Sequence, residues 1–456
     1  MAGLAQRLVV IGGDAAGMSA ASQARRRRGP DELEIVAFDK GNFVSYSACG
    51  IPYYVSGVVD ELDRLLVRQP EVFRDNYAIE AKVRHQATEI DLDRGAVLVR
   101  DLDAGLDRWE PFDDLVVATG AIPRRPSLPG AHAPGIFGVQ TLDDGVALRR
   151  YVAENHPARA VIVGGGYVGL EMAEACCALG IETHLVDGGP QPMPTLDPDM
   201  GALVARALVE FGTILHMGEE VTAFETSVGG GGVAGVATAG GTIPADLVVL
   251  GLGVRPNADL AGAAGLAVGP SGGIAVDRRM RTSHAGVWSA GDCAEKFHRV
   301  SGQRVAVALG THANKEGRVA GINLGGGYAT FPGVIGTAAT KVGSLEVART
   351  GLNEAQAASA GFVARAVVSE STTRAGYYPG AAPITTKLVV EQGTGRLLGA
   401  QIVGRQGAAK RIDALALAVW HAMDVEDLLS VDLSYAPPYS PVWDPVLAAA
   451  RRAYEH

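Results

Sequence analysis

Cysteine is scarce in this sequence, which contains four cysteines among 456 residues. So few cysteines do not make a disulfide framework in a chain of this length, and their spacing does not match that of zinc ligands. We therefore expect a reducing environment for the protein, with the cytoplasm as its location. The four residues are Cys49, Cys176, Cys177 and Cys293.

Long apolar runs and an excess of positive charge are also missing. No run reaches the roughly 20 residues of a membrane-spanning helix, and the first apolar stretch breaks at Gly12 before it has the length of a signal peptide. Lysine and arginine together number 40 against 50 acidic residues, which gives a net charge of −10. We therefore expect no binding to nucleic acid and none to membranes.

Glycine and apolar residues, in contrast, are abundant. The sequence has 60 glycines, and 47% of its residues are hydrophobic against 20% that are charged. This composition is typical of a well-packed α/β protein with many tight turns, and it argues against a disordered or fibrous chain. The length is sufficient for about three domains of ordinary size.

Residues 8–39 have the order of a dinucleotide-binding fold. A predicted strand runs into Gly12, a predicted helix follows Gly17, and a second strand ends in Asp39. The glycines let the backbone approach a pyrophosphate, and the acid binds ribose hydroxyls. Asp14 replaces the usual middle glycine, where its carboxylate would crowd or repel a phosphate. An ordinary strand–helix turn is the alternative interpretation of this segment.

Residues 159–187 repeat this order without a departure from the pattern. The acid at the end of the second strand, Asp187, would accept a hydrogen bond from a ribose 2′-hydroxyl and repel a 2′-phosphate. Gly188 and Gly189 follow it, where a cationic side chain would be needed for NADPH. The pattern therefore favours NADH over NADPH. Its three glycines are Gly164, Gly166 and Gly169.

Further along the chain, two predicted strands end in polar turns, at residues 114–120 and 287–295. In the second turn, Asp292 is interpreted either as a helix N-cap or as a group that holds the hydroxyls of a cofactor, and both roles are compatible. From about Phe331 the sequence changes to short apolar runs followed by a predicted helix over residues 413–423. This last region predicts an α+β domain that forms a dimer interface.

The stretch Ser45 to Gly57, SYSACGIPYYVSG, carries Cys49 between a predicted strand and a predicted helix. A helix N-terminus favours the thiolate form of such a cysteine, and small neighbouring residues leave space for a partner molecule. A half-buried structural cysteine is the alternative, because free cysteines are among the most buried residues. Two nucleotide motifs in the same chain favour the functional interpretation.

Together these motifs resemble the pyridine nucleotide-disulfide oxidoreductases over nearly the whole chain. Within that family, the segments SYSACGIPYY, RAGYYPG and YAPPY are similar to those of coenzyme A-disulfide reductases, which use a single active cysteine. They contain Cys49, Tyr378 and Tyr435, and the segments ASQARR and GTHANKEGR add to the resemblance. The resemblance implies an α/β fold with two Rossmann-like domains, for FAD and NAD(P), followed by an α+β dimerisation domain. The implied segments are 1–118 with 281–326 for FAD, 119–280 for NAD(P), and 327–456 for dimerisation.

The resemblance also implies roles for individual residues. Tyr167 would gate access to the flavin, and Glu171 would lie near the nicotinamide. Cys49 would be the redox thiol, with Tyr378 and Tyr435 entering its site from the partner subunit of a homodimer. Coenzyme A would contact Gln23, Arg26 and Ser45. FAD would be held by Gly12, Gly17, Asp39, Thr119, Gly120, Gly291 and Asp292, and NADH by Gly164, Gly166, Gly169 and Asp187, with NADPH as the other candidate.

The activity implied is NAD(P)H-dependent and passes electrons through FAD to an oxidised Cys49. No second cysteine lies within a few residues of Cys49, so the oxidised form is a mixed disulfide, a persulfide or a sulfenic acid. We expect the substrate to be coenzyme A disulfide or a coenzyme A persulfide or polysulfide. Ala48 departs from the subgroup, which has a polar amide there, and this puts the coenzyme A specificity in question.

Three other functions stay open at this point. An NADH oxidase or peroxidase would cycle Cys49 through a sulfenic acid, although such relatives usually carry a histidine in the first glycine turn, which this sequence lacks. An electron-transfer flavoprotein reductase would pass electrons to a protein partner without using the thiol. A non-catalytic FAD- and NADH-binding protein would signal through its redox state.

Overall fold

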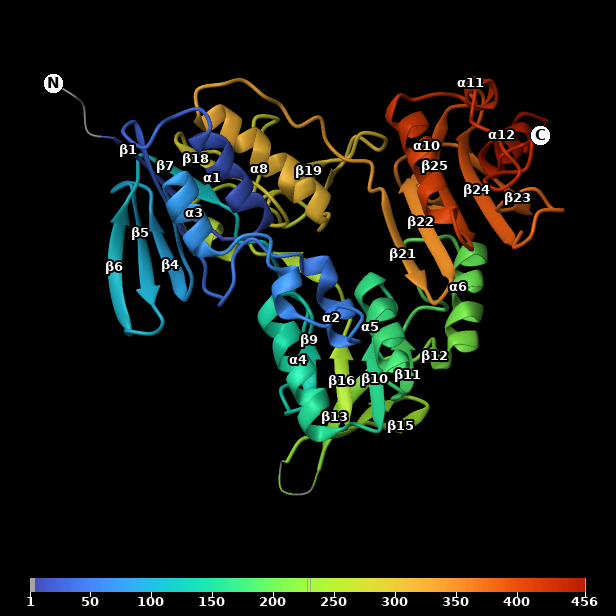
Figure 1. Cartoon of the computed structure of the whole chain (residues 1–456), viewed down its shortest axis with the longest axis horizontal. Helices are drawn as coiled ribbons and strands as arrows, with labels where there is room; N and C mark the ends of the chain where they lie inside the picture. Colours follow the sequence, from blue (N-terminus) through green and yellow to red (C-terminus); the bar gives the residue numbers. More distant parts are fainter. Residues whose placement is uncertain (1–4, 228, 230, 456) are drawn as a thin grey trace.

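The computed structural model describes residues 5–227, 229 and 231–455. Figure 1 presents three groups of elements, with an N-terminal sheet to the left, a second sheet below the centre and a C-terminal sheet to the right. Among the described residues, no helix combines the length and the apolar character needed to cross a membrane.

The first group is built on a parallel sheet of five strands in the order β18-β7-β1-β2-β3. These strands are short apolar runs that are buried on both faces, as expected when helices cover a parallel sheet. Their bounds are β1 (Gln6–Ile11), β2 (Leu33–Phe38), β3 (Ile79–Lys82), β7 (Asp114–Val117) and β18 (Val287–Ser289). An antiparallel sheet lies beside them, with β4 (His85–Asp91), β5 (Ala96–Asp101) and β6 (Leu106–Pro111).

Two helices far apart in the sequence pack closely in this group. They are α1 (Ala15–Arg25) and α8 (Gly310–Leu324), which lie side by side in Figure 1. A Cβ atom on Gly317 of α8 would stand 2.2 Å from the carbonyl oxygen of Ala16, so only glycine permits this approach. The helix α3 (Pro70–Tyr77) completes the group. The close packing brings the residues before α8 to the start of α1.

The second group repeats the first, with parallel strands in the order β12-β11-β10-β16-β9. Its strands are β9 (Ile136–Gly138), β10 (Arg159–Val163), β11 (Glu182–Asp187), β12 (Thr213–Met217) and β16 (Leu247–Leu250). Its helices are α4 (Leu142–Asn155), α5 (Tyr167–Ala178) and α6 (Pro198–Phe211). A small antiparallel sheet flanks it, with β13 (Val221–Thr226), β14 (Val233–Thr238) and β15 (Gly241–Pro244).

Two short segments connect the first and second groups as an antiparallel pair, β8 (Ala121–Pro123) with β17 (Val254–Pro256). The chain leaves the first group through β8 and leaves the second through β17. The remaining small elements are α2 (Ile51–Val55), α7 (Asp259–Ala263), β19 (Lys296–Phe297) and β20 (Arg304–Val305).

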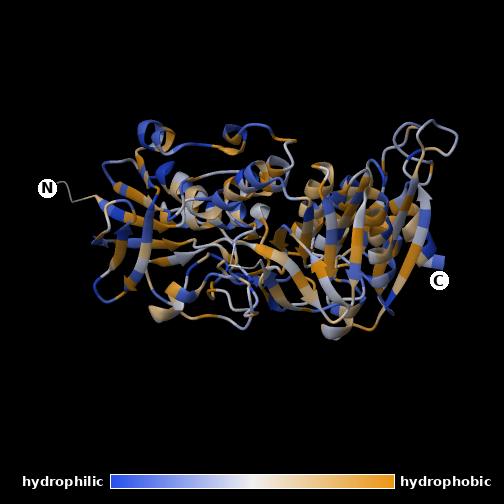
Figure 2. Ribbon diagram, turned by 90° about the horizontal axis from the view of Figure 1, so that it is seen from below, coloured by the Kyte–Doolittle hydropathy of each residue, from blue (hydrophilic) through white to orange (hydrophobic). Residues whose placement is uncertain are grey.

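The third group is an antiparallel sheet in the order β21-β22-β25-β24-β23. Figure 2 shows hydrophobic and hydrophilic residues in alternating bands along these strands. The strands are β21 (Ala338–Val342), β22 (Leu345–Gly351), β23 (Ala364–Thr372), β24 (Pro383–Glu391) and β25 (Leu397–Gly404). The helices are α9 (Glu354–Ser359), α10 (Ala408–Trp420), α11 (Val425–Leu429) and α12 (Pro445–Glu455).

The predicted helix over residues 413–423 is displaced in the structure, where α10 begins at Ala408. Its first turn receives the carboxylate of Glu346 from β22, which accepts hydrogen bonds from the N–H groups of Gly407 and Ala409. This cap comes from a distant strand, so it was not visible in the local sequence. The predicted domain segments stay a prediction.

Candidate active site

The two predicted nucleotide turns have the same geometry. A Cβ atom on Gly17 would stand 1.9 Å from the carbonyl oxygen of Gly12, and one on Gly169 would stand 1.9 Å from that of Gly164. Each helix thus begins against its own turn. Neither α1 nor α5 has a side-chain cap on its first N–H groups, which leaves those groups to bind a phosphate.

An acidic residue lies at each predicted ribose position. The Asp39 carboxylate accepts the N–H groups of Gly13 and Gly41, both at 2.8 Å, and burial raises its pKa. In the second turn, Asp187 accepts the N–H groups of Gly165 and Gly189, both at 2.7 Å. Both acids therefore fix the backbone of the glycine turn, and their remaining lone pairs suit a ribose hydroxyl.

Asp292 lies in the turn after β18. Because α1 and α8 pack closely, this turn lies at the start of α1. Its Oδ1 atom is buried and has no hydrogen-bond partner among the described residues. Burial raises the pKa of Asp292, while Lys296 acts in the opposite direction. A buried carboxylate oxygen without a donor fits the hydroxyl groups of a bound cofactor. The residues present therefore fit FAD in the first group and NADH in the second.

Two charged residues that the sequence reasoning missed hold this turn. Glu316 Oε2 accepts the N–H of Gly291 at 2.8 Å, and Lys296 Nζ donates to the Gly291 carbonyl oxygen at 2.8 Å. Lys296 also donates to the carbonyl oxygen of Ala294 at 3.0 Å. A lysine next to the Asp292 turn and a glutamate in the GTHANKEGR segment were the available signals, but no motif connects them.

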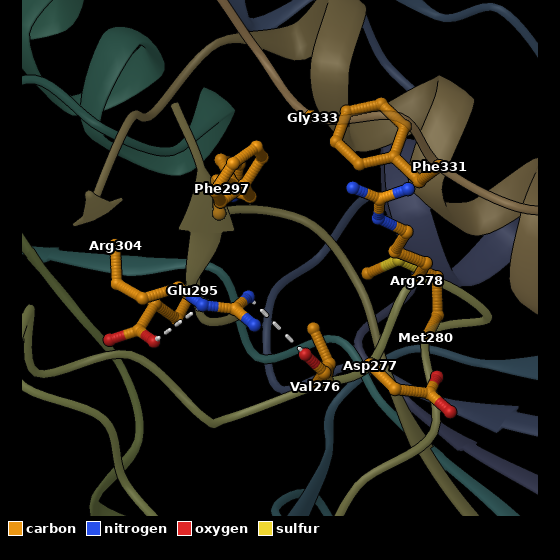
Figure 3. Close-up of a pocket in the computed structure, with 10 residues that line it drawn as sticks. Val276, Asp277, Arg278, Met280, Glu295, Phe297, Arg304, Phe331 and Gly333 are labelled. Atoms are coloured by element: carbon orange, nitrogen blue, oxygen red, sulfur yellow. Dashed lines mark hydrogen bonds and ion pairs between the residues drawn. The ribbon is translucent and has the colours of Figure 1, made fainter. Parts of the chain in front are cut away.

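A cavity of about 180 Å³ lies beside Lys296, and Figure 3 shows the side chains around it. Arg304 crosses one wall, with its Nε 3.8 Å from a carboxylate oxygen of Glu295. Phe297 and Phe331 form much of the apolar wall. None of the described residues that line this cavity is a predicted site residue, although Lys296 connects it to the Gly291 turn.

Cys49 lies in a short 3₁₀ turn, Ala48–Gly50, which leads into α2, and its side chain is exposed. The pKa of its thiol is raised, first by desolvation from the surrounding chain and then by the carboxylates of Glu171, Asp292 and Asp14. The expected preference of a helix N-terminus for the thiolate stays a prediction, and in the polypeptide desolvation and the three carboxylates act against it.

Glu171 and Tyr167 come from α5 of the second group, as predicted for residues near the nicotinamide. Glu171 Oε1 accepts the hydroxyl of Thr340 at 3.1 Å, and burial raises its pKa. Burial also raises the pKa of Tyr167, while the positive charge of Arg349 acts against that rise. Thr340 belongs to β21 of the third group, so the C-terminal sheet positions Glu171 of α5.

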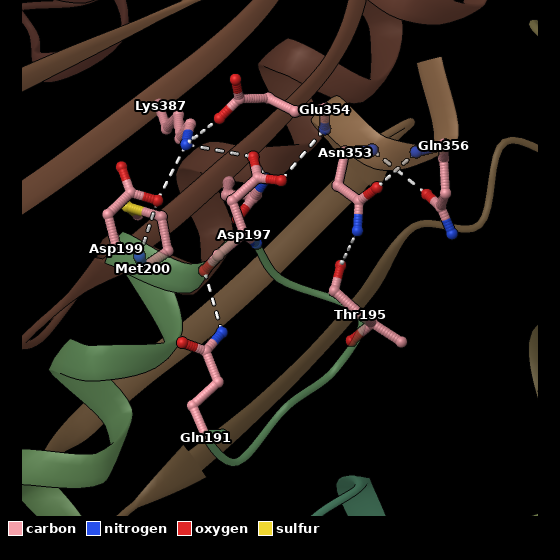
Figure 4. Close-up of polar contacts among 10 residues, drawn as sticks. Gln191, Thr195, Asp197, Asp199, Met200, Asn353, Glu354, Gln356 and Lys387 are labelled. Atoms are coloured by element: carbon pink, nitrogen blue, oxygen red, sulfur yellow. Dashed lines mark hydrogen bonds and ion pairs between the residues drawn. The ribbon is translucent and has the colours of Figure 1, made fainter. Parts of the chain in front are cut away.

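A polar network holds the loop between Asp187 and α6 against the C-terminal sheet (Figure 4). Lys387 Nζ lies 3.2 Å from Asp197, 2.8 Å from Asp199 and 2.5 Å from Glu354. Lys387 and Asp197 are buried at 3% and 2% exposure, so the pairing is largely shielded from water. The loop that follows the predicted NADH acid is thereby fixed at its far end.

Three arginines in the predicted coenzyme A region are occupied by the protein itself. Arg25 donates to the carbonyl oxygens of Arg28 and Ala78, Arg27 donates to Gln23, and Arg28 donates to Gln6 and Glu32. Arg26 is exposed, and its side chain makes no hydrogen bond or ion pair with the described residues. The predicted assignment of Arg26 to a phosphate is therefore consistent with the structure, while Gln23 has its amide oxygen engaged by Arg27.

The two predicted tyrosines lie in segments that contact each other. The N–H of Ala375 donates to the carbonyl oxygen of Pro437 at 3.1 Å, which joins the segments of Tyr378 and Tyr435. Both tyrosines are exposed, at 36% and 48%. Within the described part of this single chain, no hydrogen bond or ion pair joins either tyrosine to the Cys49 segment. Their entry into the site of a partner subunit stays a prediction.

Comparison with known proteins supports the predicted fold and activity. A family model described as pyridine nucleotide-disulphide oxidoreductase matches residues 6–324, and the dimerisation domain of the same family matches residues 337–445. The predicted fold class is thereby confirmed.

Some relatives of this chain are named as sulfur oxidoreductases and others as NADH oxidases. A Pyrococcus abyssi protein named NAD(P)H sulfur oxidoreductase (CoA-dependent) is 39% identical over 445 residues, which is 97% of each chain. A Methanocaldococcus jannaschii protein named NADH oxidase is 34% identical over 452 residues, which is 98% of each chain. Among solved structures, an NAD-dependent persulfide reductase from A. fulgidus matches with a TM-score of 0.95 and 39% identity, over 98% of this chain and 83% of that one.

Proposed function

This chain belongs to the pyridine nucleotide-disulphide oxidoreductase family, and from that premise we propose that it reduces a disulfide or persulfide of coenzyme A through Cys49. The enzyme is an FAD-dependent oxidoreductase that takes electrons from NADH or NADPH. The observation that carries the proposal is the position of the Cys49 thiol. The segment before Cys49 is hydrogen-bonded to Gly13 and Asp14 of the first glycine turn, and Ile51, just after it, lies in the same hydrophobic core as Leu170 of α5. These contacts with both nucleotide-binding groups support a thiol close to both cofactor sites.

The sulfur chemistry follows from a single reactive cysteine. The Cys49 thiolate attacks one sulfur of the substrate, so that a new S–S bond forms as the original bond breaks, and the leaving thiolate takes a proton. The electron pair of a hydride from NADH then breaks the bond to Cys49, and the second product leaves as a thiol. NADH and one proton thus convert a disulfide into two thiols.

The chain's own residues hold and separate the cofactors. FAD, when bound, would supply the two-electron carrier between NADH and sulfur. Asp292, with its unpartnered Oδ1, and Asp39 would bind the hydroxyl groups of FAD, while the uncapped start of α1 would face the pyrophosphate. In the second group, Asp187 would bind the ribose of NADH, and Tyr167 would lie between the two cofactors until NADH displaces it.

We further propose that residues of the first group recognise coenzyme A. Among the four arginines at positions 25–28, Arg26 has an exposed guanidinium that is available to bind a phosphate. The side chains of its neighbours donate hydrogen bonds to main-chain oxygens instead. Ser45 adopts a left-handed conformation with φ of 48°, which a serine rarely takes outside functional segments. The CoA-dependent name of the Pyrococcus abyssi relative supports this substrate class.

A homodimer with shared active sites completes the proposal. The third group matches the dimerisation domain of the family. Its surface exposes several large apolar side chains that a second copy of the chain would cover. They include Tyr377, Tyr378, Tyr435, Tyr439, Val442 and Trp443. In such a dimer the tyrosine hydroxyls of one subunit would protonate the thiolate that leaves Cys49 of the other.

An NADH oxidase is the second candidate function. The Methanocaldococcus jannaschii relative bears that name, and the exposed Cys49 thiol is accessible to peroxide or oxygen products. In this case Cys49 would cycle through a sulfenic acid, and no thiol product would form.

The proposal is tested by anaerobic turnover of the FAD-loaded protein. NADH oxidation is measured with coenzyme A disulfide, coenzyme A persulfide, glutathione disulfide and hydrogen peroxide in separate reactions, together with the thiol or sulfide formed. We expect turnover with a coenzyme A substrate and the release of thiol or sulfide in proportion to NADH. Turnover with peroxide alone would replace the proposal with the oxidase alternative.

A further inference from the structure

Asp14 has no role in nucleotide binding that its position explains. It occupies the middle glycine position of the first turn and begins α1, with an extended backbone at φ of −107° and ψ of −152°. Its side chain does not cap the helix that follows it. Instead, its Oδ1 atom accepts the main-chain N–H of Tyr46 at 3.1 Å. The carboxylate is thus turned towards the segment that carries Cys49.

A second hydrogen bond lies beside the first. The N–H of Ser45 donates to the carbonyl oxygen of Gly13 at 2.9 Å. Two successive N–H groups of the cysteine segment are therefore bound by two successive residues of the glycine turn. Ser45 needs such support, because its φ of 48° is an unfavourable conformation for a residue with a Cβ atom.

The far side of Ser45 is bound as well. Its carbonyl oxygen accepts the N–H groups of Val67 at 2.8 Å and Arg68 at 3.3 Å, and Ser47 donates its N–H to Leu65 at 2.8 Å. The chain between Ser45 and the cysteine turn is therefore fixed from both sides. On the side of the glycine turn, only the bond to Tyr46 comes from a side chain. A glycine or alanine at position 14 has no atom to make it.

We propose that Asp14 is a positioning residue for Cys49, which ties the redox-thiol segment to the cofactor-binding turn through the N–H of Tyr46. This inference rests on the proposed function, in which Cys49 is the redox thiol. The cysteine segment then keeps a fixed position relative to the turn at the start of α1. The thiol therefore keeps a fixed position relative to the bound cofactor. This role gives a function to the aspartate that stands at position 14 in place of the usual glycine.

The charge of Asp14 has a separate effect. Burial raises its pKa to about 6, and the carboxylates of Asp39 and Asp292 also raise it. Cys49 faces Asp14 together with Glu171 and Asp292, and all three carboxylates raise the thiol pKa. Replacing Asp14 by asparagine keeps an oxygen acceptor for Tyr46 but removes a negative charge. Position and charge are therefore separable by experiment.

The experiment compares wild type, Asp14→Asn and Asp14→Ala in the FAD-loaded protein. Hydrogen exchange of the Tyr46 amide is measured by mass spectrometry. We expect Asp14→Ala to exchange about three- to tenfold faster, the range for one lost hydrogen bond, and Asp14→Asn to remain close to wild type. Asp113→Ala is the matched control, because Asp113 accepts the main-chain N–H of Arg7 at the other end of β1.

Alkylation of Cys49 by iodoacetamide across pH supplies the second readout. We expect Asp14→Asn to react about twofold faster or more near pH 7, because the thiol pKa falls when a nearby negative charge is removed. The inference is overturned if Asp14→Ala and wild type exchange the Tyr46 amide equally fast. If Asp14→Ala does not fold, Asp14→Gly, which restores the usual residue of the pattern and also lacks the acceptor, takes its place, and exchange of the Tyr46 amide as slow as in wild type then overturns the inference.

These readouts do not depend on turnover. If Cys49 proves dispensable for NADH-dependent reduction while the Tyr46 amide still responds to Asp14→Ala, the proposed function fails and the positioning of the segment stands. If turnover requires Cys49 and the amide does not respond, the proposed function stands and the role of Asp14 fails.

Discussion

Lys296 and Glu316 form an ion pair at 3.5 Å in which neither side chain is exposed to solvent. Both partners also bind the main chain of Gly291, one at its N–H and the other at its carbonyl oxygen. Burying two charges costs free energy that only close pairing and further hydrogen bonds offset. The pair therefore links the stability of the protein to the turn that carries Asp292, the residue proposed to bind FAD.

Breaking this pair should destabilise the protein and weaken FAD binding. We expect Lys296→Met to lower the free energy of unfolding by about 3–5 kcal/mol, because it leaves the Glu316 carboxylate buried without its positively charged partner. Urea unfolding and the rate of FAD release measure the two effects. The matched control is Arg255→Met, whose exposed pair with Asp259 contributes about 0–1 kcal/mol. A Lys296→Met variant as stable as this control would contradict the prediction.

Glu171 should control the ionisation of the redox thiol from the second nucleotide group. After desolvation, its carboxylate is the largest contribution to the raised pKa of Cys49. Removing that charge in Glu171→Gln should lower the thiol pKa, so that Cys49 becomes more reactive at neutral pH. The pH profile of iodoacetamide alkylation measures the change.

Glu174→Gln is the control for this charge effect. Glu174 lies one turn further along α5 and pairs with Lys341. We expect its profile to match that of wild type. Equal profiles for Glu171→Gln and wild type would show that Glu171 does not act on the thiol.

The choice of nucleotide should depend on Asp187. Wild type is expected to prefer NADH, and Asp187→Arg should move the ratio of kcat/KM values towards NADPH, since it removes the repulsion of a 2′-phosphate. Both values of kcat/KM should fall, because the N–H groups of Gly165 and Gly189 lose their acceptor. Steady-state kinetics with the two nucleotides gives the ratio. A tenfold preference of wild type for NADPH, about 1.4 kcal/mol, would refute this interpretation of Asp187.

Tyr378 and Tyr435 should act on Cys49 of the partner subunit. Truncation before Ser434 is a poor test, because it also removes α12, whose Ala449, Ala450 and Ala453 are fully buried. The double variant Tyr378→Phe/Tyr435→Phe should instead lose about 10²- to 10⁴-fold in disulfide reduction, the range for a lost general acid, and keep its FAD.

Mixed dimers distinguish a shared site from a site within one subunit. An inactive Cys49→Ser subunit combined with an inactive Tyr378→Phe/Tyr435→Phe subunit creates one intact site only if the tyrosines act across the interface. We therefore expect mixing to restore activity. Tyr328→Phe, which alters an exposed tyrosine outside these segments, serves as the control. Mixtures without activity would place the tyrosines elsewhere.

Local sequence patterns predicted the nucleotide turns well, because each depends on residues that are adjacent in the chain. Gly12, Gly17 and Asp39 lie on one strand–turn–helix–strand unit, and their geometry follows from steric rules. The pair Lys296–Glu316 could not be predicted, since nothing in the sequence indicates that the two residues meet. The raised pKa of Cys49 comes first from desolvation and then from Glu171, which the fold brings from the second group.

The central claim is that electrons leave the enzyme through the sulfur of Cys49. The most direct measurement compares wild type with Cys49→Ser under anaerobic conditions, with NADH and a coenzyme A disulfide or persulfide. Serine cannot exchange with a disulfide sulfur, so we expect the variant to keep FAD, to accept electrons from NADH, and to release no thiol or sulfide. Equal turnover by the two proteins would contradict the account and remove Cys49 from the reaction.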